Sequence, residues 1–199
     1  MPLTERLNAT DRNERRERFV ISGGPGTGKS TLLEALAESG EICYPEVSRQ
    51  LIREQMLNGT KLLPWHDLVG FARECVARMR AQITDSAGHA RAFFDRGLPD
   101  VAGYLRHGGI APVSALRKDC EAYTPMVFFA PPWREIYVND SERPQSFEES
   151  VALSVQIRRT YVEFGFVVID LERGSVQERV RQVRKFLDNA RPRAYSWVD

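Results

Sequence analysis

The chain has few cysteines, no long apolar run and almost no net charge, and each absence excludes a class of protein. Three cysteines stand among the 199 residues, Cys43, Cys75 and Cys120, and they form no CxxC pair. This spacing argues against a disulfide framework or a zinc site and is typical of a reducing compartment. No apolar run approaches the roughly 20 residues of a spanning helix, and the N-terminus is charged rather than apolar. We therefore expect a cytoplasmic protein without a membrane partner.

The charges are nearly balanced, with 28 basic and 27 acidic residues and a net charge of +1. No bulk field attracts nucleic acid or an anionic membrane, so we do not expect a nucleic-acid partner. The hydrophobic fraction of 42% and the charged fraction of 28% are ordinary for a globular protein of one domain. Any phosphate binding must therefore come from a few well-placed cations and backbone N–H groups.

Composition divides the chain into a charged N-terminal tail (residues 1–17), one domain (18–189) and a C-terminal tail (190–199). The first tail reads as a frayed or solvated segment. A nucleic-acid arm is the alternative, which its interspersed glutamates weaken.

Within the domain, short apolar runs alternate with segments whose apolar residues recur every three or four positions. The runs predict strands and the periodic segments predict helices. Strands separated by helices imply a three-layer α/β/α fold with a parallel sheet. We expect Ser48 and Ser175 to cap two of the helices. The predicted strands are 19–21, 42–44, 92–94, 126–130 and 166–169, and the predicted helices are 30–39, 48–57, 64–85, 147–164 and one from 175 onward.

The segment Gly23–Ser30 matches the phosphate-binding pattern G-x-x-x-x-G-K-[ST] at every fixed position. It follows a predicted strand and precedes a predicted helix, as this motif requires. Its glycines allow backbone N–H groups to turn toward phosphate oxygens, and the helix N-terminus favours an anion. Lys29 is placed to reach the β- and γ-phosphates of ATP, and the hydroxyl of Ser30 to bind Mg²⁺. The expected nucleotide contacts are Gly24, Pro25, Gly26, Thr27, Gly28, Lys29, Ser30 and Thr31.

Two acids follow predicted strands, where ligands of parallel sheets bind. Asp95 could hold Mg²⁺ through water or accept a proton from an acceptor hydroxyl, and the planar fork of Arg96 could reach phosphate oxygens. The alternative is that Asp95 only caps a helix that begins near Gly97. Glu46 could act as a general base toward a substrate hydroxyl, with Arg49 binding the substrate's charge. A surface ion pair explains Glu46 equally well.

A long polar segment after the fourth strand contains Arg134 and Arg143 and could form a lid over the triphosphate. Trp133 in the same segment could stack on a ligand or anchor the lid in the core. Residues 171–175, after the fifth strand, could contact the base of the nucleotide, although a glycine turn followed by a helix cap explains them equally well.

Taken together, the phosphate loop, the segments 45–50 and 94–100, and the arginine-bearing segment resemble the AAA_28-type predicted ATPases. These are similar to the kinase domain of NadR and, more distantly, to deoxynucleoside kinases. The resemblance spans residues 18 to about 189 and implies five parallel strands with the phosphate-loop strand central and a lid after strand four. It also implies that Glu46 is a base, that Asp95 and Arg96 form an acidic–arginine pair, and that Arg134 and Arg143 are lid arginines. Gly97 stands where those kinases have a serine, which leaves the acceptor open.

Two functions fit these residues. The first is a kinase that moves the γ-phosphoryl group of ATP to a hydroxyl of a nucleoside-like or other small metabolite. The second is an ATPase switch that binds a partner and uses no small-molecule acceptor. The acid on the acceptor side and the arginine-bearing segment favour the kinase. The oligomeric state stays open.

Overall fold

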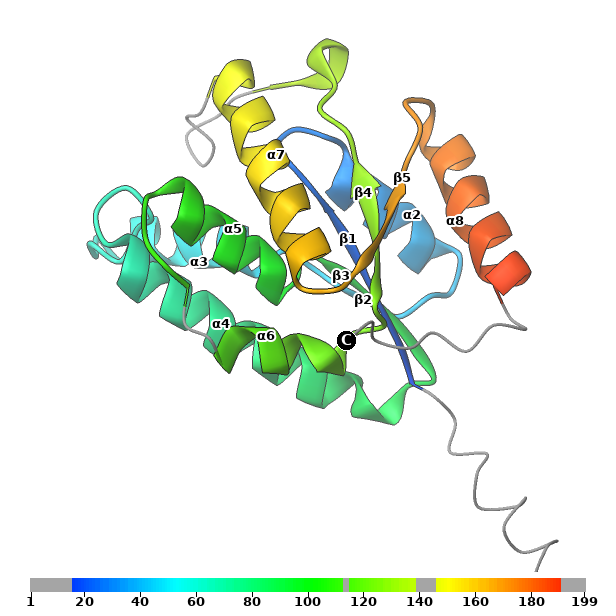
Figure 1. The fold of residues 1–199 in the computed structure, drawn as a ribbon, viewed down its shortest axis with the longest axis horizontal. Helices are drawn as coiled ribbons and strands as arrows, with labels where there is room; N and C mark the ends of the chain where they lie inside the picture. The colour runs from blue at the N-terminus through cyan, green and yellow to red at the C-terminus, as the bar shows by residue number, and fades with distance from the viewer. Residues whose placement is uncertain (1–15, 113–114, 139–145, 191–199) are drawn as a thin grey trace, which may run out of the picture.

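The five apolar runs form one parallel sheet in the order β2-β3-β1-β4-β5. The computed structural model describes residues 16–112, 115–138 and 146–190. The strand that enters the phosphate loop is central and pairs with β3 on one side and β4 on the other, which confirms the predicted α/β fold (Figure 1). The strands are β1 (Glu17–Gly23), β2 (Cys43–Tyr44), β3 (Arg91–Asp95), β4 (Met126–Ala130) and β5 (Val167–Asp170).

Helices cover both faces of the sheet and make the three layers (Figure 1). One face carries α2 (Lys29–Glu38) and α8 (Val176–Ala190). The other face carries α3 (Val47–Leu57), α4 (Leu68–Asp85), α5 (Leu98–His107), α6 (Ala115–Asp119) and α7 (Phe147–Glu163). Three short 3₁₀ helices complete the described elements: η1 (Ser86–Gly88), η2 (Cys120–Ala122) and η3 (Arg134–Ile136). Within the described ranges, no helix is both long and apolar enough to cross a bilayer.

The side chains of the central strands alternate between the two hydrophobic layers. Phe19 and Ile21 of β1 pack toward α2 and α8, whereas Val20 between them packs toward α3, α4, α5 and α7. All three are fully buried. Parallel strands covered on both faces read as continuous apolar runs for this reason.

Capping residues move two helix starts away from the predicted positions. Asp67 accepts a hydrogen bond from the amide of Gly70 at 2.8 Å, so α4 begins at Leu68 rather than near residue 64. The N-cap of α3 is Glu46, and Ser48 instead donates its hydroxyl to the Glu46 carboxylate at 2.6 Å. The predicted cap at Ser175 is confirmed, since its hydroxyl accepts from the amide of Glu178 at 3.3 Å.

Two further differences concern β1 and α5. β1 begins at Glu17, two residues before the predicted start, where Arg91 of the neighbouring strand pairs with the Glu17 carboxylate at 2.7 Å. α5 is absent from the predicted strands and helices, apart from the possible helix start near Gly97. It lies against α7 and brings residues 98–107 beside the end of β3.

Gly103 sets the closeness of α5 and α7. A Cβ atom at this position would lie 3.0 Å from the Cα of Ile157 and 3.0 Å from its Cγ1. Because the first of these atoms is backbone, it cannot turn aside, and the helices would have to separate.

We therefore expect Gly103→Val to lower the free energy of unfolding by about 1–3 kcal/mol. Urea unfolding measures this change. Gly88→Val is the matched control, because no atom lies within 4 Å of a Cβ there, and it should change stability by less than about 0.5 kcal/mol. Equal effects of the two substitutions would show that the contact between α5 and α7 is not tight.

Candidate functional site

The loop between β1 and α2 has a conformation that only glycine adopts easily at two positions. Gly26 and Gly28 have φ angles of 71° and 76°, and a Cβ on Gly26 would lie 2.5 Å from the ring of Tyr137. The amides of Gly26, Thr27 and Gly28 donate to no main-chain carbonyl among the described residues. These amides and the N-terminus of α2 form a concave set of donors that suits an anion.

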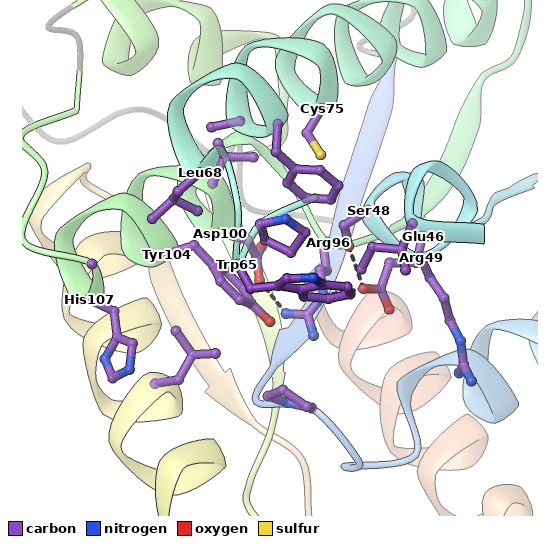
Figure 2. A pocket seen from close by; sticks show the side chains of 18 of the residues that line it. Glu46, Ser48, Arg49, Trp65, Leu68, Cys75, Arg96, Asp100, Tyr104 and His107 are labelled. Atoms are coloured by element: carbon purple, nitrogen blue, oxygen red, sulfur yellow. Dashed lines mark hydrogen bonds and ion pairs between the residues drawn. The ribbon is translucent and has the colours of Figure 1, made fainter. Parts of the chain in front are cut away.

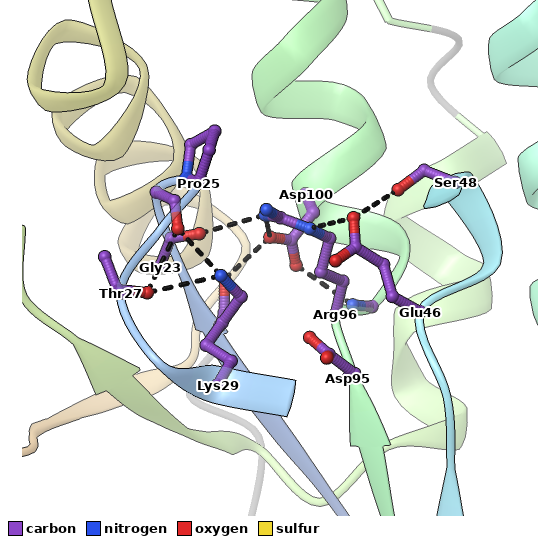
Figure 3. Close-up of polar contacts among 12 residues, drawn as sticks. Gly23, Pro25, Thr27, Lys29, Glu46, Ser48, Asp95, Arg96 and Asp100 are labelled. Atoms are coloured by element: carbon purple, nitrogen blue, oxygen red, sulfur yellow. Dashed lines mark hydrogen bonds and ion pairs between the residues drawn. The ribbon is translucent and has the colours of Figure 1, made fainter. Parts of the chain in front are cut away.

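Lys29, the first residue of α2, lies under this loop with only 4% of its surface exposed. Its Nζ donates to the carbonyl of Gly24 at 2.7 Å and to the hydroxyl of Thr27 at 3.2 Å (Figure 3). Burial, with the nearby charge of Arg96, lowers the pKa of Lys29 to about 8. Within the described residues, no carboxylate forms an ion pair with this ammonium group, so an anionic ligand would stabilise its charged form.

Ser30 and Asp95 meet beside Lys29, as the sequence predicts. The Ser30 hydroxyl donates to Asp95 Oδ2 at 2.7 Å. The other carboxylate oxygen, Oδ1, is buried and has no hydrogen-bond partner within the described residues. Burial and the neighbouring charge of Glu46 raise the pKa of Asp95 to about 6. The alternative that Asp95 caps a helix is wrong, because the N-cap of α5 is Gly97 and Asp95 gives it no hydrogen bond.

Glu46 and Arg96 form a buried ion pair at the edge of the same site. Arg96 Nε donates to Glu46 Oε1 at 3.0 Å, and the exposed fractions of the two side chains are 4% and 18%. Burial alone would raise the pKa of Glu46, but Arg96, Lys29 and the Ser48 hydroxyl together lower it to about 2. The carboxylate is therefore fully ionised at neutral pH, and the surface ion pair considered for Glu46 is instead a largely buried one.

Arg96 is held by the fold on several sides. Its φ angle is 71°, in the left-handed region that a side chain seldom occupies. Besides its bond to Glu46, its Nη1 donates to the Gly23 carbonyl at 2.9 Å and to Asp100 Oδ1 at 3.1 Å (Figure 3). The guanidinium lies 5.6 Å from the ring centre of Tyr104. This arginine fixes the start of the phosphate loop, a role that its position after β3 does not reveal.

Asp100, on α5, is a residue of the candidate site that the sequence did not point to. Its carboxylate accepts hydrogen bonds from the Ser22 hydroxyl at 2.7 Å, the Tyr161 hydroxyl at 2.5 Å and the amide of Gly97 at 2.9 Å, in addition to Arg96. Only 1% of Asp100 is exposed. The available signal was an acid three residues after Gly97, the spacing of a carboxylate that caps a helix start.

Arg179, on α8, is the second residue missed. Its Nη1 donates to the Thr27 carbonyl at 2.7 Å and its Nε to the Glu172 carbonyl at 3.0 Å. Its Nη2 is buried without a partner among the described residues, and the guanidinium lies 5.3 Å from the ring centre of Trp133. Desolvation lowers the pKa of Arg179. Its position four residues before Val183 places it on the apolar face of α8, where a charged residue is a signal of function.

Of the two predicted lid arginines the structure describes only Arg134, whose printed contacts are not with the phosphate loop. Arg134 begins η3 and is 65% exposed; it pairs with Glu148 at 2.6 Å and lies 4.1 Å from the ring centre of Phe147. Arg143 lies outside the described residues, as do its neighbours between residues 139 and 145. The lid role of both arginines stays a prediction.

Two cavities meet at this edge of the sheet. A cavity of about 570 Å³ lies over the phosphate loop and is lined by residues 25–31, Trp133 and residues 174–176 and 179. A second cavity of about 260 Å³ extends between α3, α4 and α5 (Figure 2). The residues that line both are Pro25, Glu46, Arg49 and Arg96. The two cavities therefore share part of their wall.

Three solved structures that this chain resembles are named as kinases. Shikimate kinase from Acinetobacter baumannii has a TM-score of 0.61 at 16% identity, over 92% of this chain and 99% of that one. Deoxyadenosine kinase from M. mycoides has a TM-score of 0.58 at 14% identity, over 86% and 99%. Thymidylate kinase from Ehrlichia chaffeensis has a TM-score of 0.54 at 16% identity, over 87% and 98%. At these identities the likeness establishes the fold.

A sequence relative supports the same comparison over a shorter stretch. The adenylate kinase isoenzyme 6 homolog of Caenorhabditis elegans is 43% identical over 51 residues, which is 26% of this chain. The match spans 28% of that protein's length. The specific likeness to the NadR kinase domain is not tested by these comparisons. Residues 18–179 match the family model AAA_28, described as an AAA domain, and the chain therefore belongs to the AAA_28 family.

Proposed function

We propose that this protein is a kinase that transfers the γ-phosphoryl group of ATP to a hydroxyl of a nucleoside-like or other small metabolite. The observation that carries this proposal is the pair of adjoining cavities that share Glu46, Arg49 and Arg96. A phosphoryl transfer between two bound molecules needs two such sites with a common wall. A switch that only hydrolyses ATP needs the first cavity and has no use for the second.

The larger cavity is the proposed nucleotide site. The loop amides would hold the phosphates, and Lys29 would exchange its bond to the Gly24 carbonyl for bonds to the β- and γ-phosphates. Trp133 and residues 174–176, which follow β5, also line this cavity, and the nucleoside portion would lie against them. Arg179 faces the same cavity, and its charge lacks a carboxylate partner within the described residues.

Ser30 and Asp95 fit a magnesium ion. The hydroxyl and carboxylate oxygens are hard ligands of the type that Mg²⁺ prefers, and the buried, unpartnered Oδ1 of Asp95 has hydrogen-bonding capacity that the described residues do not satisfy. A bound Mg²⁺ would neutralise charge on the β- and γ-phosphates. A positive ion at this position would also lower the pKa of Asp95 from its raised value.

Glu46 is the residue that would orient the acceptor, because it lines both cavities. In the step, the acceptor oxygen forms a bond to the γ-phosphorus while the bond from that phosphorus to the bridging β–γ oxygen breaks. ADP leaves with the electron pair of that bond, and the hydroxyl proton passes to Glu46 and then to water. The low pKa of Glu46 is compatible with a loose transition state, in which the attacking hydroxyl becomes acidic late.

Phosphoryl transfer is tested with γ-labelled ATP, Mg²⁺ and a pool of small metabolites. We expect label in an organic product, and we expect Lys29→Met to raise the Kd for Mg·ATP at least about a hundredfold, because the lost charge-assisted bonds have no substitute in the loop. Lys61→Met, at an exposed position, is the control. Label found only in free phosphate would favour the switch, and an unchanged Kd for Lys29→Met would contradict the nucleotide site.

Asp95→Asn should separate stability from turnover. Between pH 3.8 and about 6 the folded state binds more protons at Asp95 than the unfolded state does, so the free energy of unfolding falls as the pH rises. An asparagine at this position cannot ionise, so the variant does not lose stability as the pH rises. Its side-chain oxygen can still accept the hydrogen bond from the Ser30 hydroxyl. The variant should be more stable at pH 7.5 by on the order of 1 kcal/mol, with no gain near pH 4.

The same variant should keep its affinity for ATP and lose turnover by about a hundredfold or more, because the carboxylate charge is gone. Chemical unfolding at several pH values and steady-state kinetics measure the two effects, with the exposed Asp188→Asn as control. If the variant keeps full turnover and its gain in stability does not depend on pH, the assignment of Asp95 to the magnesium site is wrong.

Arg179→Met should raise the Kd for Mg·ATP about tenfold or more, since a buried cation beside the loop would no longer attract the polyphosphate. Calorimetric titration measures this change, and Arg181→Met, exposed on the same helix, is the control. If the variant is folded and binds Mg·ATP as the parent does, Arg179 serves only to hold the Thr27 carbonyl.

A further inference from the structure

The smaller cavity has the size and lining of a site for a compact organic molecule. Its volume of about 260 Å³ is near the lower end of the roughly 300–1,000 Å³ of small-molecule sites. It lies between α3, α4 and α5, with α7 beside it and the start of the phosphate loop at one end. The aliphatic and thioether side chains in its wall are Ile52, Leu68, Val101, Leu153 and Met79.

Three aromatic side chains add flat apolar surface to this wall. Phe71 of α4 is 6% exposed and Trp65, just before α4, is 44% exposed, while Tyr104 comes from α5. Figure 2 shows Trp65 and Tyr104 on the side where Arg96 and Glu46 lie. Aromatic faces bind flat rings by stacking and by excluding water.

Four polar side chains of the cavity lie at the end that joins the nucleotide cavity (Figure 2). Glu46, Ser48, Arg96 and Asp100 lie together there (Figure 2), and most of their hydrogen-bonding capacity is used within the protein. The cavity therefore has a polar end beside the nucleotide cavity and mainly apolar walls elsewhere. A hydroxyl would face Glu46 and the phosphate donor, and the rest of the molecule would contact apolar walls.

The charges around the cavity do not favour an anion. Its wall contains three carboxylates, those of Glu46, Asp100 and Glu149, against two arginines, Arg49 and Arg96. The guanidinium of Arg96 already pairs with Glu46 and Asp100. Figure 2 shows Arg49 pointing away from the part of the cavity that Tyr104 and His107 line. Burying a phosphate or carboxylate against this wall would leave its charge uncompensated.

We infer that the acceptor is an alcohol without negative charge that carries a flat, largely apolar ring, and that the cavity discriminates against phosphorylated or carboxylated acceptors. This inference rests on the proposed kinase function and specifies the substrate class of its second cavity. The uncharged alcohol would place its hydroxyl at Glu46 and its ring among Phe71, Trp65 and Tyr104.

The test measures ADP formation and phosphorylated product with Mg·ATP and three sets of acceptors at equal concentration. The sets are nucleosides, their 5′-monophosphates, and hydroxylated cyclic carboxylates such as shikimate. We expect kcat/KM for the best nucleoside to exceed that for every anionic acceptor at least a hundredfold. A preference for monophosphates or carboxylates would overturn the inference and leave the kinase function intact. Release of free phosphate with no phosphorylated acceptor in any set would overturn both.

Two variants test the location of the acceptor. Ala72→Phe fills the cavity from α4, where Ala72 is 6% exposed, and Trp65→Ala removes an aromatic face from a position exposed enough to tolerate the change. Each should raise the KM for the acceptor at least tenfold and leave the Kd for Mg·ATP unchanged. Ala81→Phe, exposed on the same helix, is the matched control. An unchanged acceptor KM in both variants would overturn the assignment of this cavity.

Discussion

The carboxylate of Asp100 connects the segments that meet at the phosphate loop. It accepts hydrogen bonds from Ser22 at the end of β1, from Tyr161 on α7 and from Gly97 and Arg96 after β3. These groups come from separate parts of the chain and share this one acceptor. Since each of them is buried or nearly so, removing the carboxylate would leave several donors unsatisfied. Asp100 therefore supports the start of the loop together with Arg96, whose guanidinium it pairs with and which donates to the Gly23 carbonyl.

Three buried charged groups beside the loop, Lys29, Asp95 and Arg179, are not fully compensated by other groups of the described residues. Lys29 has a lowered pKa and Asp95 a raised one, in both cases chiefly because burial disfavours the charged form. Arg179 is buried, and its pKa is lowered by desolvation alone. Such groups cost stability in a folded protein, and they are common where a charged ligand supplies the missing partner. The ion pair of Glu46 and Arg96, by contrast, is satisfied internally and keeps its geometry without a ligand.

Local patterns in the sequence predicted the strands, most of the helices and the residues that the parallel sheet brings to one edge. Lys29, Ser30, Asp95 and Glu46 lie together because each follows a strand or begins the helix after it, and that rule needs no tertiary information. α5 escaped prediction because its face toward α7 contains Gly103 and Asp100, which do not form an apolar stripe. Partners such as Tyr161 and Arg179 depend on which helices pack together, and no local pattern encodes that choice. The conformation of Arg96 likewise depends on its hydrogen bonds to Glu46 and Gly23, which are distant from it in the sequence.

The bond from Arg179 to the Thr27 carbonyl also bears on where this domain ends. The family match stops at residue 179, whereas α8 continues to Ala190 and buries Val183 and Leu187 against the sheet. A chain shortened to the limits of the match would keep only one turn of α8. That turn would lack Val183 and Leu187, which pack against the sheet. The guanidinium of Arg179 would then no longer be held against the Thr27 carbonyl. The helix α8 thus contributes to the wall of the cavity over the phosphate loop, and the folded domain extends beyond the residues that match the family model.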